Sequence, residues 1–198
     1  MGRIAAVVLG IALAATPAVA QYVSDAEPFI AAVAERDGAK AMQLVEARPS
    51  VVNARNGKGE TALIVAIARS DDMWTRFLLS KGADPNLAER DGNTPLITAA
   101  RVGYLDAADL LLRRGAKVDA TNRMGETALI VAVQVRQLPI VKLLLAKGAD
   151  PHRTDSAQGY SALDYARRDP RAREVLAAIE ASIRKPPAKS DKLDDFKL

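Results

Sequence analysis

Residues 89–100 read ERDGNTPLITAA, and three further segments of the chain repeat this pattern. The copies are NGKGETALIVAIA over 56–68, NRMGETALIVAV over 122–133 and, more loosely, SAQGYSALDYA over 156–166. The shared glycine recurs at intervals of 33, 33 and 34 residues. A fixed period near 33 is typical of a solenoid in which similar helical units stack. Solenoids generally act by presenting a surface.

Each unit predicts a hairpin followed by two helices. In the unit that begins at residue 56, Asn56–Gly59 carries an Asn-Gly turn signal and a glycine that frees the backbone at the hairpin exit. Thr61 is placed to cap a first helix over about 62–69, because its hydroxyl can accept a hydrogen bond from a first-turn amide. A second helix ends near Lys81, and Gly82 follows as the residue that terminates it.

These units resemble the ankyrin repeat family, whose consensus reads D-x-x-G-x-T-P-L-H-x-A-A near the start and L-L-x-x-G-A-D near the end. The match is close over 90–96 and 99–100 and again over 111–112 and 115–116. In degenerate form it extends from about residue 27 to 184. One departure is shared by all copies, since the family's histidine is replaced by Ile64, Ile97, Ile130 and Asp164. The resemblance therefore implies the fold but not the hydrogen bonds of that histidine.

The resemblance implies an all-α ankyrin-repeat solenoid of about five repeats, including degenerate caps. The expected units are an N-terminal capping repeat over 21–55, ankyrin repeats over 56–88, 89–121 and 122–154, and a C-terminal capping repeat over 155–184. In the first cap we expect Ile30 at the leucine position and Val33 at the alanine position. Residues 185–198, with two prolines and mixed charge, indicate a solvated, disordered tail.

The first 20 residues predict a cleavable signal peptide. Arg3 precedes an apolar run over 4–15, and Ala18-Val19-Ala20 provides an A-x-A cleavage site, so the mature chain would begin at Gln21. This pattern predicts a periplasmic protein, with secretion as the alternative. An uncleaved anchor is disfavoured because the run falls short of the ~20 apolar residues that span a bilayer. We therefore expect no stable membrane insertion after cleavage.

The composition narrows the class of partner. The chain has 198 residues, no cysteine, a formal net charge of +4 and a pI near 9.4. The lack of cysteine excludes disulfides, thiolate catalysis and cysteine zinc sites. Basic and acidic residues are interspersed and only 4% of residues are aromatic, so a nucleic-acid partner is not expected. The small excess of positive charge allows weak attraction to acidic proteins or to anionic lipid. The expected partner is another protein of unknown identity, for which an acidic surface would suit this charge.

In ankyrin proteins the hairpin tips and the exposed side of each first helix line a concave, partner-binding surface. Transferred by position, these offsets give the candidate binding residues Arg36, Arg69, Arg90, Arg101, Arg123, Met124, Tyr160 and Arg168. Arginine is enriched at binding hot spots. The alternative is a solvated face whose arginines pair locally with Glu35, Glu60, Asp91 and Glu126.

Catalytic, cofactor and metal chemistry are not predicted. His152 is the only histidine, and its place after Pro151 indicates a turn. Asp71–Asp72 is explained by helix capping rather than by an acid and base pair. Gly57–Thr61 lacks the full spacing of a phosphate loop and is interpreted as the hairpin.

The sequence thus favours an exported protein–protein interaction module or scaffold. A narrower version is a dedicated stabiliser or inhibitor of one envelope enzyme or toxin. Two other classes are weaker: an enzyme with a carboxylate-based site, for which no nucleophile motif is present, and a binder of nucleic acid or anionic surfaces, which would need a dominant basic face.

Overall fold

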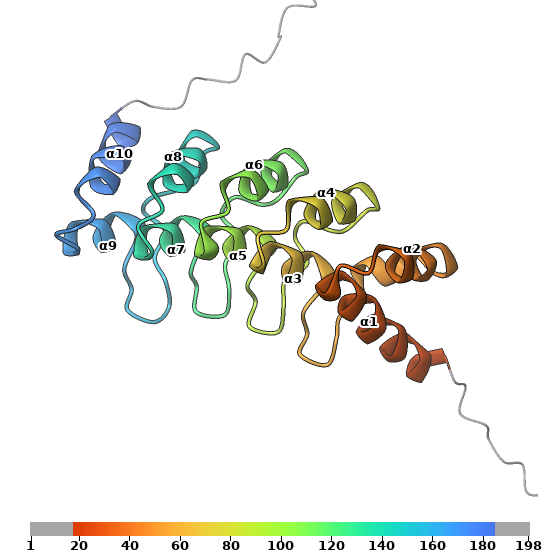
Figure 1. Cartoon of the computed structure of the whole chain (residues 1–198). Coiled ribbons are helices and arrows are strands. Elements are labelled where there is room, and N and C mark those ends of the chain that lie inside the picture. Colours follow the sequence, from red (N-terminus) through yellow and green to blue (C-terminus); the bar gives the residue numbers. More distant parts are fainter. Residues whose placement is uncertain (1–17, 185–198) are drawn as a thin grey trace, which may run out of the picture.

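The structure is a computed structural model, and it describes residues 18–184. The predicted signal peptide up to residue 17 and the predicted tail over 185–198 lie outside this range. The elements, in chain order (Figure 1), are α1 (Ala18–Glu35), α2 (Gly38–Ala47), the 3₁₀ helix η1 (Pro49–Asn53), α3 (Ala62–Ala68), α4 (Asp72–Ser80), α5 (Pro95–Val102), α6 (Leu105–Arg113), α7 (Ala128–Gln134), α8 (Leu138–Ala146), α9 (Ala162–Arg168) and α10 (Arg173–Arg184).

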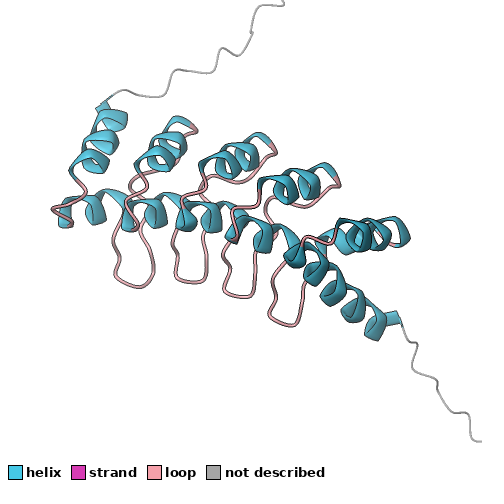
Figure 2. Ribbon diagram, in the orientation of Figure 1, coloured by secondary structure: helices cyan, strands magenta, loops and turns pink. Residues whose placement is uncertain are grey.

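The helices form two rows. An inner row of α1, α3, α5, α7 and α9 stacks side by side, and each of its helices packs against the next helix in the chain, which belongs to an outer row. Hairpin loops project from the inner row, all on the same side (Figure 2). Over residues 18–184 the only β-type pairings are three isolated bridges, one at the base of each of three hairpin loops. The predicted all-α solenoid is confirmed.

Each inner helix of the repeats begins at a capping hydroxyl. The side chain accepts a hydrogen bond from the amide three residues on, at 3.2 to 3.3 Å, in Thr61, Thr94, Thr127 and Ser161. At Ser161 the cap is reciprocal, because Asp164 accepts from the Ser161 amide at 3.0 Å. Asp164 replaces the family's histidine, so here the substitution stabilises the helix start.

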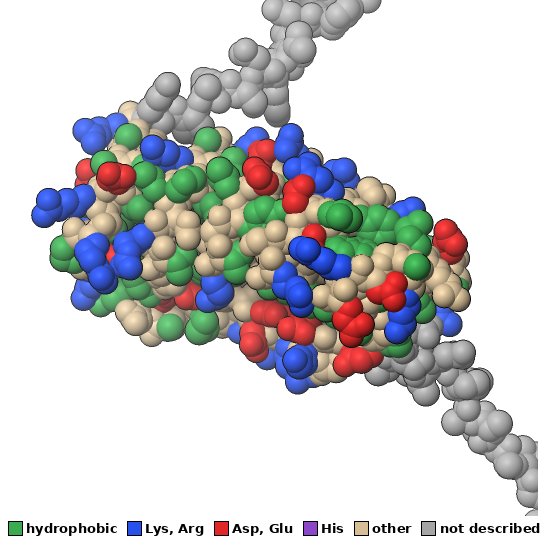
Figure 3. Space-filling model, viewed as in Figure 1, with side chains coloured by type: hydrophobic (Ala, Val, Ile, Leu, Met, Phe, Trp, Pro, Cys, Tyr) green, Lys and Arg blue, Asp and Glu red, His purple; other side chains and the backbone are tan. Residues whose placement is uncertain are grey.

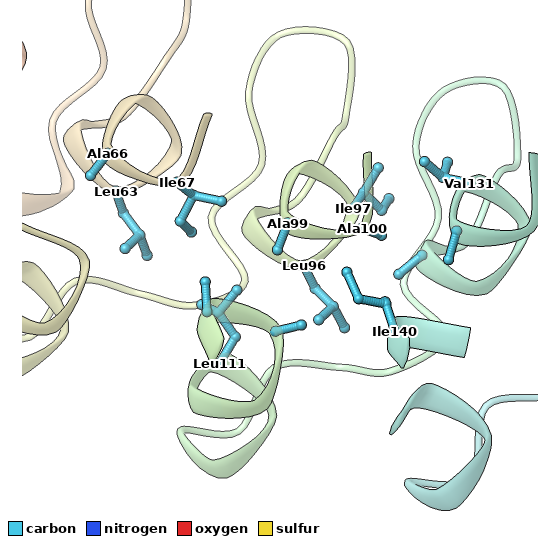
Figure 4. Packing of buried hydrophobic residues seen from close by; sticks show 14 of the residues in the cluster. Leu63, Ala66, Ile67, Leu96, Ile97, Ala99, Ala100, Leu111, Val131 and Ile140 are labelled. Carbon is cyan, nitrogen blue, oxygen red and sulfur yellow. The ribbon is translucent and has the colours of Figure 1, made fainter. Parts of the chain in front are cut away.

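The core is one continuous apolar layer between the two rows (Figure 4). Leu63 and Leu96 point from the inner row toward the outer row, and both are 1% exposed. Ala66 and Ala99 are 1% and 0% exposed, and their small side chains let neighbouring inner helices approach closely. The burial predicted for the leucine of each central repeat is confirmed.

The expected register of the first capping unit is wrong by one residue. Phe29 and Ala32, both 0% exposed, occupy the leucine and alanine positions that Ile30 and Val33 were expected to hold. The turn geometry shows the correspondence: the Asp37 amide donates to the Ala32 oxygen at 2.8 Å. This matches the bond from the Asp71 amide to the Ala66 oxygen at 2.9 Å. The small residue is therefore kept in the cap.

The first unit also begins differently, because α1 replaces the hairpin of the other repeats. Pro28 lies inside α1, at the position that Pro95 occupies as the first residue of α5. The predicted cleavage site between Ala20 and Gln21 falls within the first turn of α1. Cleavage there would shorten the helix by three residues and leave its packed part intact.

Asparagines tie successive outer loops together. The Asn53 amide group donates to the Gly82 oxygen at 3.0 Å, and its oxygen accepts from the Asp84 amide at 2.8 Å. Asn86 repeats the first of these bonds one unit later, to the Gly115 oxygen at 3.1 Å. Each of these bonds joins an asparagine side chain to backbone about one repeat later in the chain. The stack is therefore held by polar contacts as well as by its core.

Candidate functional site

The candidate site is the face formed by the hairpins and the adjoining side of the inner helices, which we call the concave face. The hairpins precede α3, α5, α7 and α9 and lie in a row (Figures 1 and 2). The tips of the last three hairpins are bonded to one another through the backbone, since the Arg123 amide donates to the Asp91 oxygen at 3.1 Å. The Ser156 amide donates in the same way to the Met124 oxygen at 2.7 Å. These three tips therefore form one connected rim.

An amide–carboxylate hydrogen bond closes each of the first three hairpins. The bonded pairs are Asn56 with Glu60 at 2.9 Å, Asn93 with Glu89 at 2.5 Å, and Asn122 with Glu126 at 2.8 Å. The sequence analysis did not predict these asparagine–glutamate hydrogen bonds. Their signal was an Asn and a Glu four residues apart in each of these three hairpins, in reversed order at 89–93.

A residue in the last turn of an inner helix donates a hydrogen bond back to the base of the preceding hairpin. Arg101 donates to the Asn93 side-chain oxygen at 3.3 Å, and Gln134 donates to Glu126 at 3.2 Å. Asn122 also donates to the Asn93 oxygen at 3.0 Å, so a row of polar side chains crosses from one repeat to the next. Arg101 remains exposed at the surface of this row.

The local pairing expected for the arginines as a solvated face is not observed. Within residues 18–184, none of the predicted binding arginines makes an ion pair with Glu35, Glu60, Asp91 or Glu126. Glu60 and Glu126 are instead bonded to the asparagines of their own hairpins.

Two of the predicted binding residues have structural partners. The guanidinium of Arg36 lies 2.7 Å from the carboxylate of Asp71, which also caps α4. Arg90 donates to the Gly57 oxygen at 2.8 Å and so joins two hairpins. These contacts give both side chains a role in stacking.

The arginines do not form a single straight stripe. Counted from the helix cap, Arg101 and Arg168 are the seventh residues, whereas Arg69 is the eighth. Arg36 corresponds to Ser70, because both have left-handed backbone, with φ of 60° and 53°. One residue turns a side chain by about 100° around a helix. Arg69 and Arg36 are therefore displaced from the concave face toward the helix–helix turn.

At the C-terminal end of the concave face, Arg168 stacks on an aromatic ring. Its guanidinium lies 4.2 Å from the centre of the Tyr160 ring, and Tyr160 packs edge-on against Tyr165. The Tyr165 hydroxyl donates to Asp155 at 2.5 Å. Burial acts to raise the pKa of Asp155, but this bond and three backbone amides outweigh it, so the pKa lies below its usual 3.8. The fourth hairpin is thus organised by a carboxylate.

Arg123 and Met124 are exposed side by side at the tip of the third hairpin. Their backbone is held by both neighbouring hairpins, while their side chains project into solvent and Met124 is 50% exposed. Arg123 makes no side-chain hydrogen bond or ion pair with any other residue of the described range. A cation and an apolar side chain are therefore presented together on a rigid tip.

The other candidate chemistries find structural explanations. The His152 amide donates to Asp150 at 2.9 Å in an exposed turn, and Asp71 caps α4. Residues 57–61 form part of the first hairpin. Between residues 18 and 184, the side chains of His, Asp and Glu form no group of three placed to bind a metal ion. No helix in that part of the chain has the length and apolarity needed to cross a membrane.

Comparison with known families agrees with this architecture. A family model described as ankyrin repeats (3 copies) matches residues 29–122 and 76–155. Together these matches span 29–155, which is more than half of the 198 residues and includes all the hairpins but the last. The chain therefore belongs to the ankyrin repeat family, whose stacked repeats serve as protein–protein interaction modules.

Proposed function

We propose that the protein is an exported interaction module that binds an acidic protein surface through the middle of its concave face. The observation that carries this proposal is the presentation of Arg123 and Met124 on backbone that two other hairpins hold in place. A rigid tip loses little conformational freedom on binding, which leaves more of the contact energy for affinity. We assign no catalytic step to the chain.

The charge expected of the partner follows from the lack of acidic partners for Arg101 and Arg123 within the described residues. Arg101 has one hydrogen bond of 3.3 Å to an uncharged amide, and Arg123 has no partner in the described range. A partner carboxylate would satisfy both guanidinium groups, since arginine pairs with carboxylates through its planar fork. An apolar side chain of the partner would cover Met124.

The test compares two double variants as baits for proteins of an envelope extract. Arg101→Ala/Arg123→Ala should retain the fold, because both side chains are exposed, but should weaken capture and reduce its dependence on salt. Arg76→Ala/Lys142→Ala removes two cations from the outer row and should capture as wild type does. Equal capture by the two variants would contradict the proposed surface. One stoichiometric partner, rather than several, would favour the narrower role of stabiliser or inhibitor.

Export is the second part of the proposal and rests on the sequence of residues 1–20. Intact mass of the protein from the periplasmic fraction should correspond to a chain that begins at Gln21. A full-length chain that stays in the cytoplasm would exclude export, whereas a processed chain in the medium would indicate secretion.

A further inference from the structure

A surface cavity lies where the last two helix–helix turns meet, away from the hairpins. Its volume is about 430 Å³, and it is lined by Arg136, Leu138 and residues 170–175, which include Glu174. Arg136 lies in the turn between α7 and α8, and Leu138 is the first residue of α8. Pro170 and Arg171 lie in the turn between α9 and α10, and residues 173–175 form the first turn of α10. The cavity combines an apolar floor with a basic rim.

The rim has more positive than negative charge. Asp169 is shared by two guanidinium groups, with Arg136 at 2.8 Å and Arg171 at 3.7 Å. Arg173 has no ion-pair partner within residues 18–184. The three arginines that line the cavity face two carboxylates, Glu174 in the lining and Asp169 beside it. Basic side chains accordingly gather at the end of the molecule that α9 and α10 form (Figure 3).

The helix α10, whose first turn lines the cavity, also has partly exposed apolar side chains. This helix packs against α8 and α9, and it is the last helix of the stack (Figure 1). Ile183 is 42% exposed and Leu176 is half-buried. In the preceding units, each of the outer helices α4, α6 and α8 is contacted by the next outer helix of the stack.

The chain that follows α10 has matching chemistry. Residues 185–198 read KPPAKSDKLDDFKL, in which Asp194 and Asp195 lie between Leu193 and Phe196. The 12 residues of α10 span ~18 Å at 1.5 Å per residue. The nine residues 185–193 reach up to ~30 Å when extended. The segment 193–196 can therefore return to the cavity.

We propose that residues 193–196 dock in cis into this cavity, with Asp194 and Asp195 among the three arginines and with Leu193 and Phe196 on the apolar floor. Tethering favours this occupant, because a short flexible linker gives an effective concentration of ~1 mM. The expectation of a fully solvated tail is the competing hypothesis.

The absence of cysteine makes a direct test possible. A nitroxide is attached to the full chain at Lys197→Cys, and line broadening is compared between the amides of 171–175 and those of the hairpin tip 57–59. Docking predicts broadening at 171–175 alone. The broadening should disappear in Asp194→Asn/Asp195→Asn and persist in the matched control Lys189→Gln/Lys192→Gln.

Three results would overturn docking in cis. No broadening at 171–175 would show that the segment stays away from the cavity. Broadening at 171–175 that persists in the aspartate variant would show the averaged effect of a solvated tail attached at residue 184, not docking. Broadening in a mixture in which the nitroxide and the isotope label are on different chains would show that a second copy supplies the segment.

Discussion

At the residue scale, the hydroxyl of Thr75 is buried without a partner. Thr75 is 1% exposed, and its Oγ1 atom makes no hydrogen bond. The equivalent residues of the next two repeats are Ala108 and Val141, so the position accepts an apolar side chain. Thr75→Val should raise the free energy of unfolding by about 1 kcal/mol, because it removes an unsatisfied polar group without changing the shape. Urea denaturation measures the difference.

The matched control for this prediction is Thr98→Val. Thr98 is also buried, at 9% exposure, but its hydroxyl donates to the Thr94 oxygen at 3.2 Å. Its replacement should therefore give no gain. A gain of the same size in both variants would show that the effect comes from hydrophobicity alone.

Gly92 is required both for its left-handed backbone conformation and for its close approach to the next hairpin. Its φ is +82°, and a Cβ atom added there would lie 2.9 Å from the backbone nitrogen of Arg123 in the next hairpin. Gly82 has a similar φ of +88° but open space around it. Gly82→Ala should thus cost ~1 to 2 kcal/mol for the left-handed backbone. Gly92→Ala should cost a further ~1 to 3 kcal/mol for the clash.

Thermal unfolding of the two glycine variants separates the effects. Equal losses of stability would mean that the hairpin tips separate at little cost. That result would also weaken the proposal of a rigid concave face.

At the scale of elements, neighbouring helix–helix turns are linked by polar side chains. Arg36 pairs with Asp71 at 2.7 Å, and the Tyr104 hydroxyl donates to Asp72 at 3.1 Å. Burial, with the hydrogen bond to Asp72, raises the pKa of Tyr104 to about 12. These links join residues 35 and 32 positions apart, so each depends on the stacking of two units.

The fourth hairpin should be stabilised by the charge of Asp155. Its folded pKa is below 3.8, so its contribution is present above that value and is lost as the pH falls through the folded pKa. Asp155→Asn should cost ~1.5 to 3 kcal/mol at pH 7, the range for hydrogen bonds to a charged group. The difference between wild type and variant should shrink below pH 3.8.

Denaturant unfolding at several pH values checks this prediction. Asp150→Asn is the control, because Asp150 is exposed and accepts from one amide in its own turn. It should cost less at pH 7. A difference for Asp155→Asn that stays constant from pH 7 to pH 2 would contradict the electrostatic explanation.

At the scale of the whole molecule, stability should depend on the central repeats. Leu96 and Leu129 are 1% and 0% exposed, in helices that contact inner helices on both sides. Leu→Ala at either position should cost ~2 to 5 kcal/mol. Because nearest-neighbour coupling carries solenoid stability, the loss should also broaden the unfolding transition. Leu105→Ala, at a residue 38% exposed, is the control and should cost much less. Unchanged denaturant midpoints for both core variants would contradict the register.

The central repeats were predictable because their signals are local. Thr94, Pro95 and Leu96 mark a helix start and its buried face within one short stretch. The first cap was misplaced because α1 replaces the hairpin whose glycine marks the register elsewhere. The placement of the arginines depends on the same register, since an offset of one residue changes the side of the helix on which Arg69 lies.

The sequence by itself determined the repeating unit, the two-row stack, the helix caps and the buried leucine and alanine positions. Each of these follows from residue preferences within about one period. Only the tertiary structure decided which of the candidate arginines are bonded to other residues of the protein and which, within residues 18–184, are not. The partners of Arg36 and Arg90 lie 35 and 33 residues away and come within hydrogen-bonding distance only when the units stack. Pairing across the stack depends on side-chain direction and on the spacing between repeats, and no local pattern encodes these.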